Sequence, residues 1–596
     1  MVSYKAPLDD IRFCLYDLLG YDDRVTTLPG CEEATRDVVD AILEEGARFC
    51  ENELLPLNQS GDSEGCHFDK GVVRTPKGFK EAYAAYRVAG WTGLAADPIY
   101  GGQGLPKTLE FLVQELICST NMSFGMYPGL SHGAYNALET WGSDDLKART
   151  LPHLADGRWA GTMCLTEPHC GTDLGLIHTR AEPLEGQRYG ITGQKIFISA
   201  GEHDLTENIL HLVLARLPDA PSGTRGISLF LVPKFLLGES GDDLGQRNGV
   251  SCGSIEEKMG IKASSTCVMN FDGAEGYLVG EPHGGMKAMF TMMNAARLGV
   301  GIQGLGLAET AYQSAVAYAR ERRQGRSLAG PAEPQQKADP IIVHPDVRKN
   351  LMTMRALNEG SRALAIWVGM ELDVAERHPD MTRRQEADDF VALMTPVIKA
   401  FCTDHGFDAA TRAQQIYGGH GYIKEQGIEQ LVRDARITQI YEGTNGIQAL
   451  DLVGRKLGQN MGRLLRRFFH PVHGFIEENQ TDPTLAIYVL PLAKAFSRLQ
   501  QATAWVAQQG LRDPEEAGAA ASDYLRLFAL VALAYVWART AKLCLAKQEG
   551  DSGGFYRAKI NTADFYMARI LPESNALFQQ IMAGKKPLMA MAADDF

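Results

Sequence analysis

The sequence predicts a mainly α-helical protein with a β domain in the middle of the chain. In the first and last parts, apolar residues recur at three- and four-residue steps, the period of helices that are buried on one face. Between residues 161 and 281 the pattern changes to short runs of Ile, Val, Leu and Phe separated by Gly, Pro, Asp and Ser. A chain of 596 residues is also too long for one hydrophobic core, so we expect several domains.

The N-terminal part is expected to be helical. Residues 1–36 form an extension in which Ile11, Leu15 and Leu18 share one face of a short helix packed on the body. Residues 37–160 form an N-terminal α domain. The Gly- and Pro-rich segment 98–106 interrupts this domain, and because no strand precedes it and it lacks G-x-G-x-x-G, it indicates a surface connection.

The remaining domains follow from the same patterns. Residues 161–281 form the middle β domain, residues 282–460 a helical domain with a Pro-rich surface loop at 331–345, and residues 461–596 an additional helical domain. In the β domain, strands are predicted at residues 189–199, 208–216, 226–233 and 267–271. In the helical domains, long helices are predicted at residues 345–376, 386–417, 461–478 and 524–547.

Composition excludes several classes of protein. A formal net charge of -14 argues against a nucleic-acid partner, and the small basic cluster Arg463, Arg466 and Arg467 is typical of a solvated helix face. The eleven cysteines show no metal-ligand spacing, which predicts reduced thiols, no metal site and a cytoplasmic location. The N-terminus lacks an uninterrupted apolar segment, and the apolar run 527–538 is too short to span a membrane, so it predicts a buried helix.

Glu442 is the strongest candidate for a catalytic group. A helical pattern runs toward it and then breaks at Gly443 and at the pair Asn445 and Gly446, which places Glu442 where a helix gives way to a loop. Its apolar neighbours Ile440, Tyr441 and Ile447 favour a partly dry site, where a carboxylate can act as a general base. The alternative is a Glu that caps a helix or pairs with an Arg.

Four other motifs carry candidate binding residues, each with a structural alternative. The loop around Thr166 and Thr172 offers donors for a polar heterocycle, or it is a capped turn. The motif Lys-Ile-Phe-Ile-Ser at 195–199 offers an aromatic face beside a hydroxyl, although Phe in a strand is often core. The arginines at 320–326 suit a pyrophosphate or a helix dipole, and the glycines after Gln415 admit a nucleotide or end a helix.

Read together, these motifs resemble the acyl-CoA dehydrogenase family. The order is a Thr-Glu-Pro loop, the Lys-Ile-Phe-Ile-Ser strand, Arg297, a Glu-Arg-Arg-Gln-Gly helix end, Gln-x-x-Gly-Gly and Tyr-Glu-Gly-Thr, spanning about residues 37–456. The flanks resemble a bacterial subgroup with an N-terminal extension and an added C-terminal helical domain. The resemblance implies an α domain, a β-barrel-like domain and a four-helix bundle, with FAD between the β domain and the bundle.

The resemblance also assigns roles to single residues. Thr166 and Ser199 would meet the flavin ring, and Phe197 stands where many relatives place Trp. In the family, four residues hold the ADP half of FAD across a subunit interface, and the matching residues here are Arg322, Gln415, Gly418 and Gly419. Thr444 matches one further FAD contact. Gly325 departs from a common Phe, and the pair Asn445 and Gly446 departs from one whose second member is often Gln.

The resemblance implies that Glu442 is the catalytic base. Some relatives carry the base just before the position of Arg297, but here that residue is Ala296, which cannot accept a proton. Glu442 would take the α proton of an acyl-CoA while flavin N5 accepts the β hydrogen as hydride, giving trans-2-enoyl-CoA in fatty acid β-oxidation. Arg297 and Glu442 are expected to contact the substrate, and an electron-transfer flavoprotein would reoxidise the FAD.

Several alternatives remain open at the level of sequence. A straight medium- or long-chain acyl group is favoured, with 3-methylthiopropanoyl-CoA as the other substrate. Rival functions are an acyl-CoA oxidase, which shares the fold, and a DNA-associated alkylation-response flavoprotein, which the acidic charge disfavours. The added C-terminal domain would cover the surface through which smaller relatives form tetramers, which predicts a homodimer.

Overall fold

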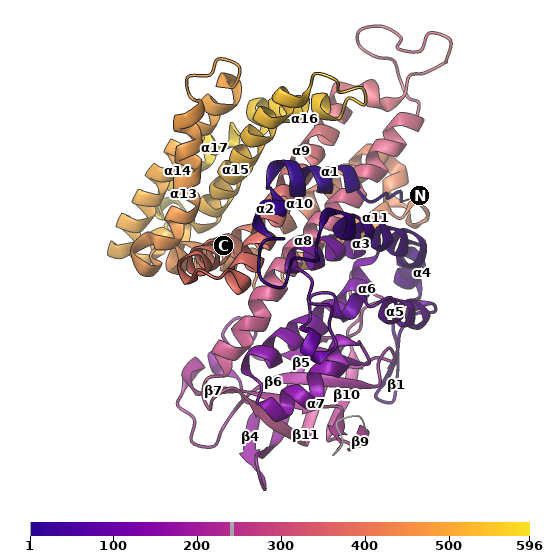
Figure 1. Ribbon diagram of the computed structural model, residues 1–596, viewed down its shortest axis with the longest axis vertical. Coiled ribbons are helices and arrows are strands. Elements are labelled where there is room, and N and C mark those ends of the chain that lie inside the picture. The colour runs from indigo at the N-terminus through magenta and orange to yellow at the C-terminus, as the bar shows by residue number, and fades with distance from the viewer. Residues whose placement is uncertain (1, 239–243) are drawn as a thin grey trace. The chain divides into compact units, whose positions relative to one another are not determined.

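The computed structural model describes residues 2–238 and 244–596, which form two compact units (Figure 1). The helical unit comprises residues 1–45, 106–115 and 300–596, and the β-containing unit comprises residues 46–105 and 116–299.

The β domain contains a sheet that closes on itself. Its strands are β3 (Trp159–Cys164), β4 (Arg180–Pro183), β5 (Arg188–Ser199), β6 (Asn208–Arg216), β7 (Ile227–Pro233), β10 (Val250–Ile255) and β11 (Thr266–Val279). They follow the order β10-β11-β5-β4-β6-β3, and β7 pairs with both β11 and β6. Strands β11, β5, β4, β6 and β7 therefore form a closed ring, which confirms the β-barrel-like domain. Ile191, Val213, Phe230, Val232 and Phe271 belong to one buried apolar cluster of this domain.

The shortest strands were not predicted from the sequence pattern. The hairpin β1 (His67–Asp69) and β2 (Val72–Arg74) lies in the region 37–160, where the sequence predicted helices and connections but no strand. Both strands have three residues, too few to show a period of two, and Lys70 and Gly71 turn with positive φ of 50° and 86°. A second hairpin, β8 (Phe235–Leu237) and β9 (Leu244–Arg247), was also not predicted.

The helices of the α domain agree better with the sequence. They are α3 (Arg36–Phe49), α4 (Leu55–Glu64), α5 (Phe79–Val88), α6 (Lys107–Trp141) and α7 (Asp144–Ala155). Helix α6 is kinked at Asn121, whose φ of -157° and ψ of 88° are not helical. The side-chain oxygen of Asn121 accepts a hydrogen bond from the Phe124 backbone at 3.0 Å and so caps the second half of the helix.

The helical unit is built around long helices that pack on each other. The first group is the part of α8 (Gly285–Glu321) from residue 300 on, α9 (Pro345–Arg377), α10 (Met381–Tyr417), α11 (Ile428–Thr438) and α12 (Asn445–Asp451). The second is α13 (Arg463–Asn479), α14 (Ala486–Arg512), α15 (Pro514–Lys547), α16 (Phe555–Phe565), α17 (Glu573–Met582) and α18 (Lys586–Met589). In Figure 1, α14, α16 and α17 lie against α15, and α15 also contacts α9 and α10.

Helix α15 is longer than the apolar run in the sequence suggested. Among the described residues it is the one helix long and apolar enough to cross a membrane by length and composition. However, 83% of its most apolar 18-residue window is buried inside the protein. This confirms the prediction that the segment is a buried helix.

A buried network of charges holds the N-terminal extension. Helix α1 (Leu8–Arg12) continues into a π-helical turn, 13–18, and Asp10 is buried there. The Arg362 guanidinium of α9 pairs with Asp10, with Glu115 at 2.7 Å and with Glu309 at 2.9 Å. Lys559 of α16 also pairs with Asp10. Each charge has an opposite partner, as burial in a low-dielectric interior requires.

Candidate active site

Glu442 lies in the loop that joins α11 to α12. The loop runs from Gln439 to Thr444, and Glu442 has a φ of +55°, followed by Gly443 at +86°. Left-handed backbone is uncommon for a residue with a side chain and marks a constrained turn. Glu442, Tyr441 and Ile447 are half-buried, but Ile440 is 44% exposed. Ile440 therefore does not wall off Glu442 within the chain as the sequence suggested.

The next helix stabilises this loop. The Gln448 side chain of α12 donates hydrogen bonds to the carbonyl oxygens of Glu442 and Gly443, both at 3.2 Å. The Thr444 hydroxyl caps α12 by accepting from the Ile447 backbone at 3.4 Å. The Tyr441 hydroxyl donates to the Gln303 side chain of α8. The turn predicted from Gly443 is thus present, and Thr444 is exposed at its end.

The Thr166 loop of the β domain is fixed to strand β5. The carbonyl of Thr166 accepts a hydrogen bond from the Ile196 backbone at 2.9 Å. The next residue, Glu167, is buried and forms an ion pair with fully buried Lys195 at 2.8 Å. Glu167 also accepts hydrogen bonds from the His178 backbone at 2.6 Å and from the Thr179 hydroxyl at 2.6 Å. Burial alone would raise the pKa of Glu167, but the charge of Lys195 and these hydrogen bonds lower it to about 2.

Phe197 is placed by a β-bulge. The register between β5 and β11 slips between the pairs Ile198–Cys267 and Lys195–Met269, which leaves two residues of β5 opposite one residue of β11. At this bulge Phe197 has a φ of +57° and its side chain is 60% exposed. Ser199 ends the strand and is half-buried. The bulge turns an apolar ring outward, on the same strand as a hydroxyl, as a flat heterocycle would require.

The residues assigned to the ADP half of the cofactor lie at the ends of α8 and α10. Tyr318, one turn before Arg322, stacks on Tyr417 with ring centroids 4.0 Å apart and shares a hydrogen bond of 2.8 Å with His420. These contacts bring the helix end that carries Arg322 to the glycine turn after α10. Exposed residues at the two helix ends are Arg322, Gln415, Gly418 and Gly419.

The glycine turn offers accessible backbone. Gly418 has a φ of +59°, and its N–H donates to the Gln415 carbonyl, which ends α10 as the structural alternative proposed. A Cβ built on Gly418 or Gly419 would meet no atom within 4 Å, so the space beside the backbone is open. At the α8 end, Arg323 pairs with Glu333 at 2.7 Å and Arg326 with Asp339 at 3.2 Å. These two arginines hold the 331–345 loop, whereas Arg322 is exposed.

Arg297 lies in α8 and is buried, with 6% of its surface exposed. Its guanidinium donates to the Asn294 side chain at 3.5 Å. The residue before it is Ala296, as the sequence requires.

The structure thus groups the predicted residues other than Arg297 into three sets. The β-containing unit brings together Thr166, Phe197 and Ser199; one part of the helical unit brings together Arg322, Gln415, Gly418 and Gly419; the loop between α11 and α12 holds Glu442 and Thr444. An exposed aromatic ring with hydroxyls, and an exposed Arg beside open glycine backbone, fit the flavin ring and the pyrophosphate of FAD respectively.

Sequence reasoning overlooked the residues that support these sets. Glu167 and Lys195 both belong to quoted motifs, but their ion pair was not predicted. The sequence did contain a sign of this ion pair, because a Lys among the apolar residues of a central strand needs an acidic partner if it is buried.

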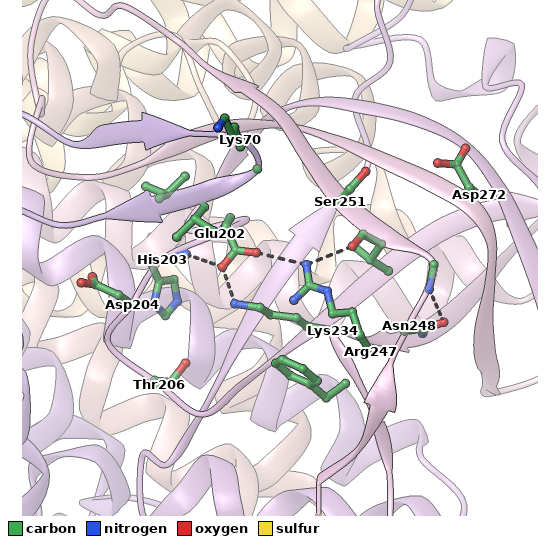
Figure 2. Close-up of a pocket in the computed structure, with 16 residues that line it drawn as sticks. Lys70, Glu202, His203, Asp204, Thr206, Lys234, Arg247, Asn248, Ser251 and Asp272 are labelled. Carbon is green, nitrogen blue, oxygen red and sulfur yellow. Dashed lines mark hydrogen bonds and ion pairs between the residues drawn. The ribbon is translucent and has the colours of Figure 1, made fainter.

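A separate pocket of about 690 Å³ in the β-containing unit is lined by the β1–β2 hairpin and by residues of the β domain (Figure 2). Three of its charged residues pair with one another: Glu202 contacts Lys234 and, at 3.4 Å, Arg247. Buried His203 also lines the pocket, and burial lowers its pKa to about 3, so it is neutral. Among the described residues that line this pocket, none is a predicted site residue.

Four family models match successive parts of the chain. Three describe acyl-CoA dehydrogenase: its N-terminal domain at residues 37–158, its middle domain at 162–274 and its C-terminal domain at 283–457. The fourth, described as acetyl-CoA dehydrogenase C-terminal like, matches residues 468–592.

Relatives of known name match along the whole chain. A 3-methylmercaptopropionyl-CoA dehydrogenase of Ruegeria pomeroyi is 44% identical, over 97% of this chain and 98% of the relative. A broad-specificity linear acyl-CoA dehydrogenase of Mycobacterium tuberculosis is 33% identical, over 96% of both chains. A butyryl-CoA dehydrogenase of Syntrophomonas wolfei is 32% identical, over 96% of this chain and 95% of the relative.

Solved structures share the fold. An acyl-CoA dehydrogenase of Bacillus anthracis complexed with FAD has a TM-score of 0.75 at 21% identity, covering 98% of this chain and 92% of that chain. A structure described as the electron transferring flavoprotein of Acidaminococcus fermentans has a TM-score of 0.58 at 27% identity, covering 72% of this chain and 99% of that chain.

Proposed function

The chain belongs to the acyl-CoA dehydrogenase family of FAD-dependent oxidoreductases, and on this premise we propose that it converts a short, unbranched acyl-CoA to the trans-2-enoyl-CoA. The observation that carries the proposal is the position of Glu442. This carboxylate is half-buried in a left-handed turn between two helices. The resemblance of its Tyr-Glu-Gly-Thr motif to the family motif supports the assignment of Glu442 as the base.

Glu442 removes the α proton of the thioester. An α C–H is a weak acid, so the base must be an ionised carboxylate held close to Cα in one orientation. The loop supplies this orientation through the contacts of Gln448 and Tyr441. Ala296 leaves the alternative base position without a proton acceptor. When bound, FAD supplies the acceptor for the hydrogen and the electron pair that leave the β carbon.

The remaining site residues bind cofactor and substrate. Thr166, Phe197 and Ser199 hold the flavin ring, and Arg297 contributes to substrate binding. The ADP half of FAD and its linker are held by Arg322, Gln415, Gly418, Gly419 and Thr444. The exposed Phe197 ring and the open backbone of Gly418 support this assignment, because both are surfaces that a ligand would cover.

The relatives favour a short acyl group over the medium or long chain expected from the sequence. Two relatives are named for short substrates, 3-methylmercaptopropionyl-CoA and butyryl-CoA. We therefore assign a short linear chain, with 3-methylmercaptopropionyl-CoA first. A medium- or long-chain acyl-CoA is the second candidate, since another relative is described as broad in specificity for linear acyl-CoA.

The biological setting is proposed on the same basis. An electron-transfer flavoprotein reoxidises the enzyme, and the likeness to a structure described by that name supports this partner. We retain a homodimer, a cytoplasmic location and the five-part division at residues 36, 160, 281 and 460. The family-model limits at 158, 162, 274, 283 and 457 support the division.

An anaerobic titration of the FAD-loaded enzyme tests the function. 3-Methylmercaptopropionyl-CoA and butyryl-CoA should bleach the flavin fastest, and octanoyl- and palmitoyl-CoA more slowly. Glu442→Gln should slow bleaching by about 10²- to 10⁴-fold, the range typical for loss of a general base. Glu425→Gln, at an exposed Glu of the same unit, should not change the rate. Bleaching by Glu442→Gln at the unmodified rate would refute the assignment.

A further inference from the structure

We propose that Asn445 is a positioning residue that holds the Glu442 carboxylate in its working orientation by clasping the loop to α10. The proposal rests on the proposed role of Glu442 as base. It assigns to Asn445, the first member of the pair that departs from the family pattern, a role in the helical unit rather than in binding the dinucleotide.

The Asn445 side chain is fully used by α10. The Thr403 hydroxyl donates to the Lys399 carbonyl at 2.7 Å and accepts from Asn445 Nδ2 at 3.0 Å. Asn445 Oδ1 accepts a hydrogen bond from Lys399 Nζ at 2.8 Å. Its Nδ2 donates to Asp404 Oδ1 at 2.7 Å, and Ala400 O lies 3.2 Å from the same nitrogen. An amide oxygen has two lone pairs and an amide nitrogen two protons, so this set satisfies both atoms.

The clasp closes the loop around Glu442. Asp404 Oδ1 also accepts a hydrogen bond from the Gln439 side chain at 2.6 Å. One carboxylate therefore binds both Gln439, three residues before Glu442, and Asn445, three residues after it. The Asn445 backbone N–H donates to the Gln439 carbonyl at 3.1 Å, which joins the two ends directly. Both ends of the loop are therefore fixed to one short segment of α10, from Lys399 to Asp404.

The conformation of Glu442 explains why a clasp is needed. A left-handed residue with a side chain costs about 1 kcal/mol or more, and such a residue persists only where its surroundings determine it. When the loop ends are released, the backbone at Glu442 can relax toward negative φ, and the carboxylate then moves away from Cα of the substrate. A displacement of about 1 Å can lower a rate about 10²-fold.

Asn445 acts through Glu442 and not on the substrate. Its polar side-chain atoms face α10, and their partners are all residues of that helix. Substitution should therefore change the proton-transfer step while leaving substrate affinity and FAD content almost unaltered.

The test measures flavin reduction in the FAD-loaded full chain by anaerobic stopped flow. Asn445→Ala should lower the limiting rate about 10- to 100-fold, with the substrate concentration for half-maximal rate and the flavin-to-protein ratio changed less than about two-fold. Asn350→Ala is the matched control, because Asn350 of α9 also bonds α10, through Arg412 at 2.8 Å, away from this loop. It should reduce flavin at the unmodified rate.

A reciprocal exchange distinguishes the clasp from general destabilisation. Asn445→Asp keeps an acceptor for Lys399 but removes the donor to Asp404 and sets two carboxylates against each other, so it should reduce flavin more slowly than the unmodified protein. Adding Asp404→Asn restores the hydrogen bond in the reverse direction, because the amide at position 404 now donates to the carboxylate at position 445. The double variant should reduce flavin at least ten-fold faster than Asn445→Asp alone. The proposal is overturned if Asn445→Ala reduces flavin at the unmodified rate, or if the double exchange is no faster than Asn445→Asp.

The base assignment can fail separately. If Glu442→Gln bleaches at the unmodified rate, the proposed function is wrong whatever the Asn445 variants do. If Glu442→Gln is inactive and Asn445→Ala is unaffected, the positioning role alone is refuted.

Discussion

The Thr166 loop and the Glu442 loop are held in place by different chemistry. The first depends on an ion pair between Glu167 and Lys195, both almost entirely buried. The second depends on a neutral amide, Asn445, set between Lys399 and Asp404. A buried ion pair is costly to break because it leaves a bare charge, whereas an amide can be removed or reversed at smaller cost. The two loops therefore predict variants of different severity.

Lys195→Met should be the most damaging change. It leaves the Glu167 carboxylate buried without its cation and should lower the free energy of unfolding by about 3–5 kcal/mol. Chemical denaturation of the FAD-loaded protein measures this effect, with Lys80→Met on an exposed face of α5 as the control. The double variant Lys195→Met with Glu167→Gln should regain part of the loss, because no charge then remains. A loss below about 1 kcal/mol for the single variant would contradict the importance of the pair.

Acid should weaken the β domain through the same pair. The folded pKa of Glu167 is lowered to about 2 from its ordinary 4.5. Its contribution to stability, about 3 kcal/mol, is complete above the unfolded-state pKa and disappears as the pH falls from about 4.5 to about 2, because the carboxylate must take up a proton. Unfolding free energy measured against pH should fall less steeply for Glu167→Gln. Equal slopes would mean that another group controls the acid transition.

Asn445→Ala should have a milder effect on stability than on rate. Loss of a neutral amide from the α10 contacts should lower the unfolding free energy by about 1–2 kcal/mol, less than Lys195→Met. The same denaturation experiment gives the value. A loss as large as that of Lys195→Met would erase the distinction between the two loops.

Phe197→Ala should change stability least. The ring is 60% exposed, so its removal should alter the unfolding free energy of the FAD-free protein by less than about 0.5 kcal/mol. FAD should nevertheless dissociate faster, because the substitution removes the ring on which the flavin is proposed to stack. The flavin released during gel filtration measures this, and unchanged retention would place the flavin ring elsewhere.

The sequence predicted features that repeat and missed those that depend on distant partners. Strand β6 and helix α9 agree closely with their expected ranges, because their apolar periods are long and uninterrupted. The Glu442 turn was predicted because Gly443 marks it locally. The Asn445 clasp could not be predicted, since Lys399 lies 46 residues away and only folding brings it near. The exposure of Phe197 depends on a β-bulge that cannot be recognised from the amino-acid composition of the strand.

The buried charges of the N-terminal extension set an order for biosynthesis. Asp10 pairs with Lys559, which lies 549 residues later in the chain. At about 5–20 residues per second, the ribosome needs about half a minute to two minutes to complete that interval. Until then α1 has no ammonium group to neutralise Asp10 at the site that Lys559 will fill. Arg362 can pair with Asp10 earlier, but the full charge balance around Asp10 requires residue 559 and so nearly the whole chain.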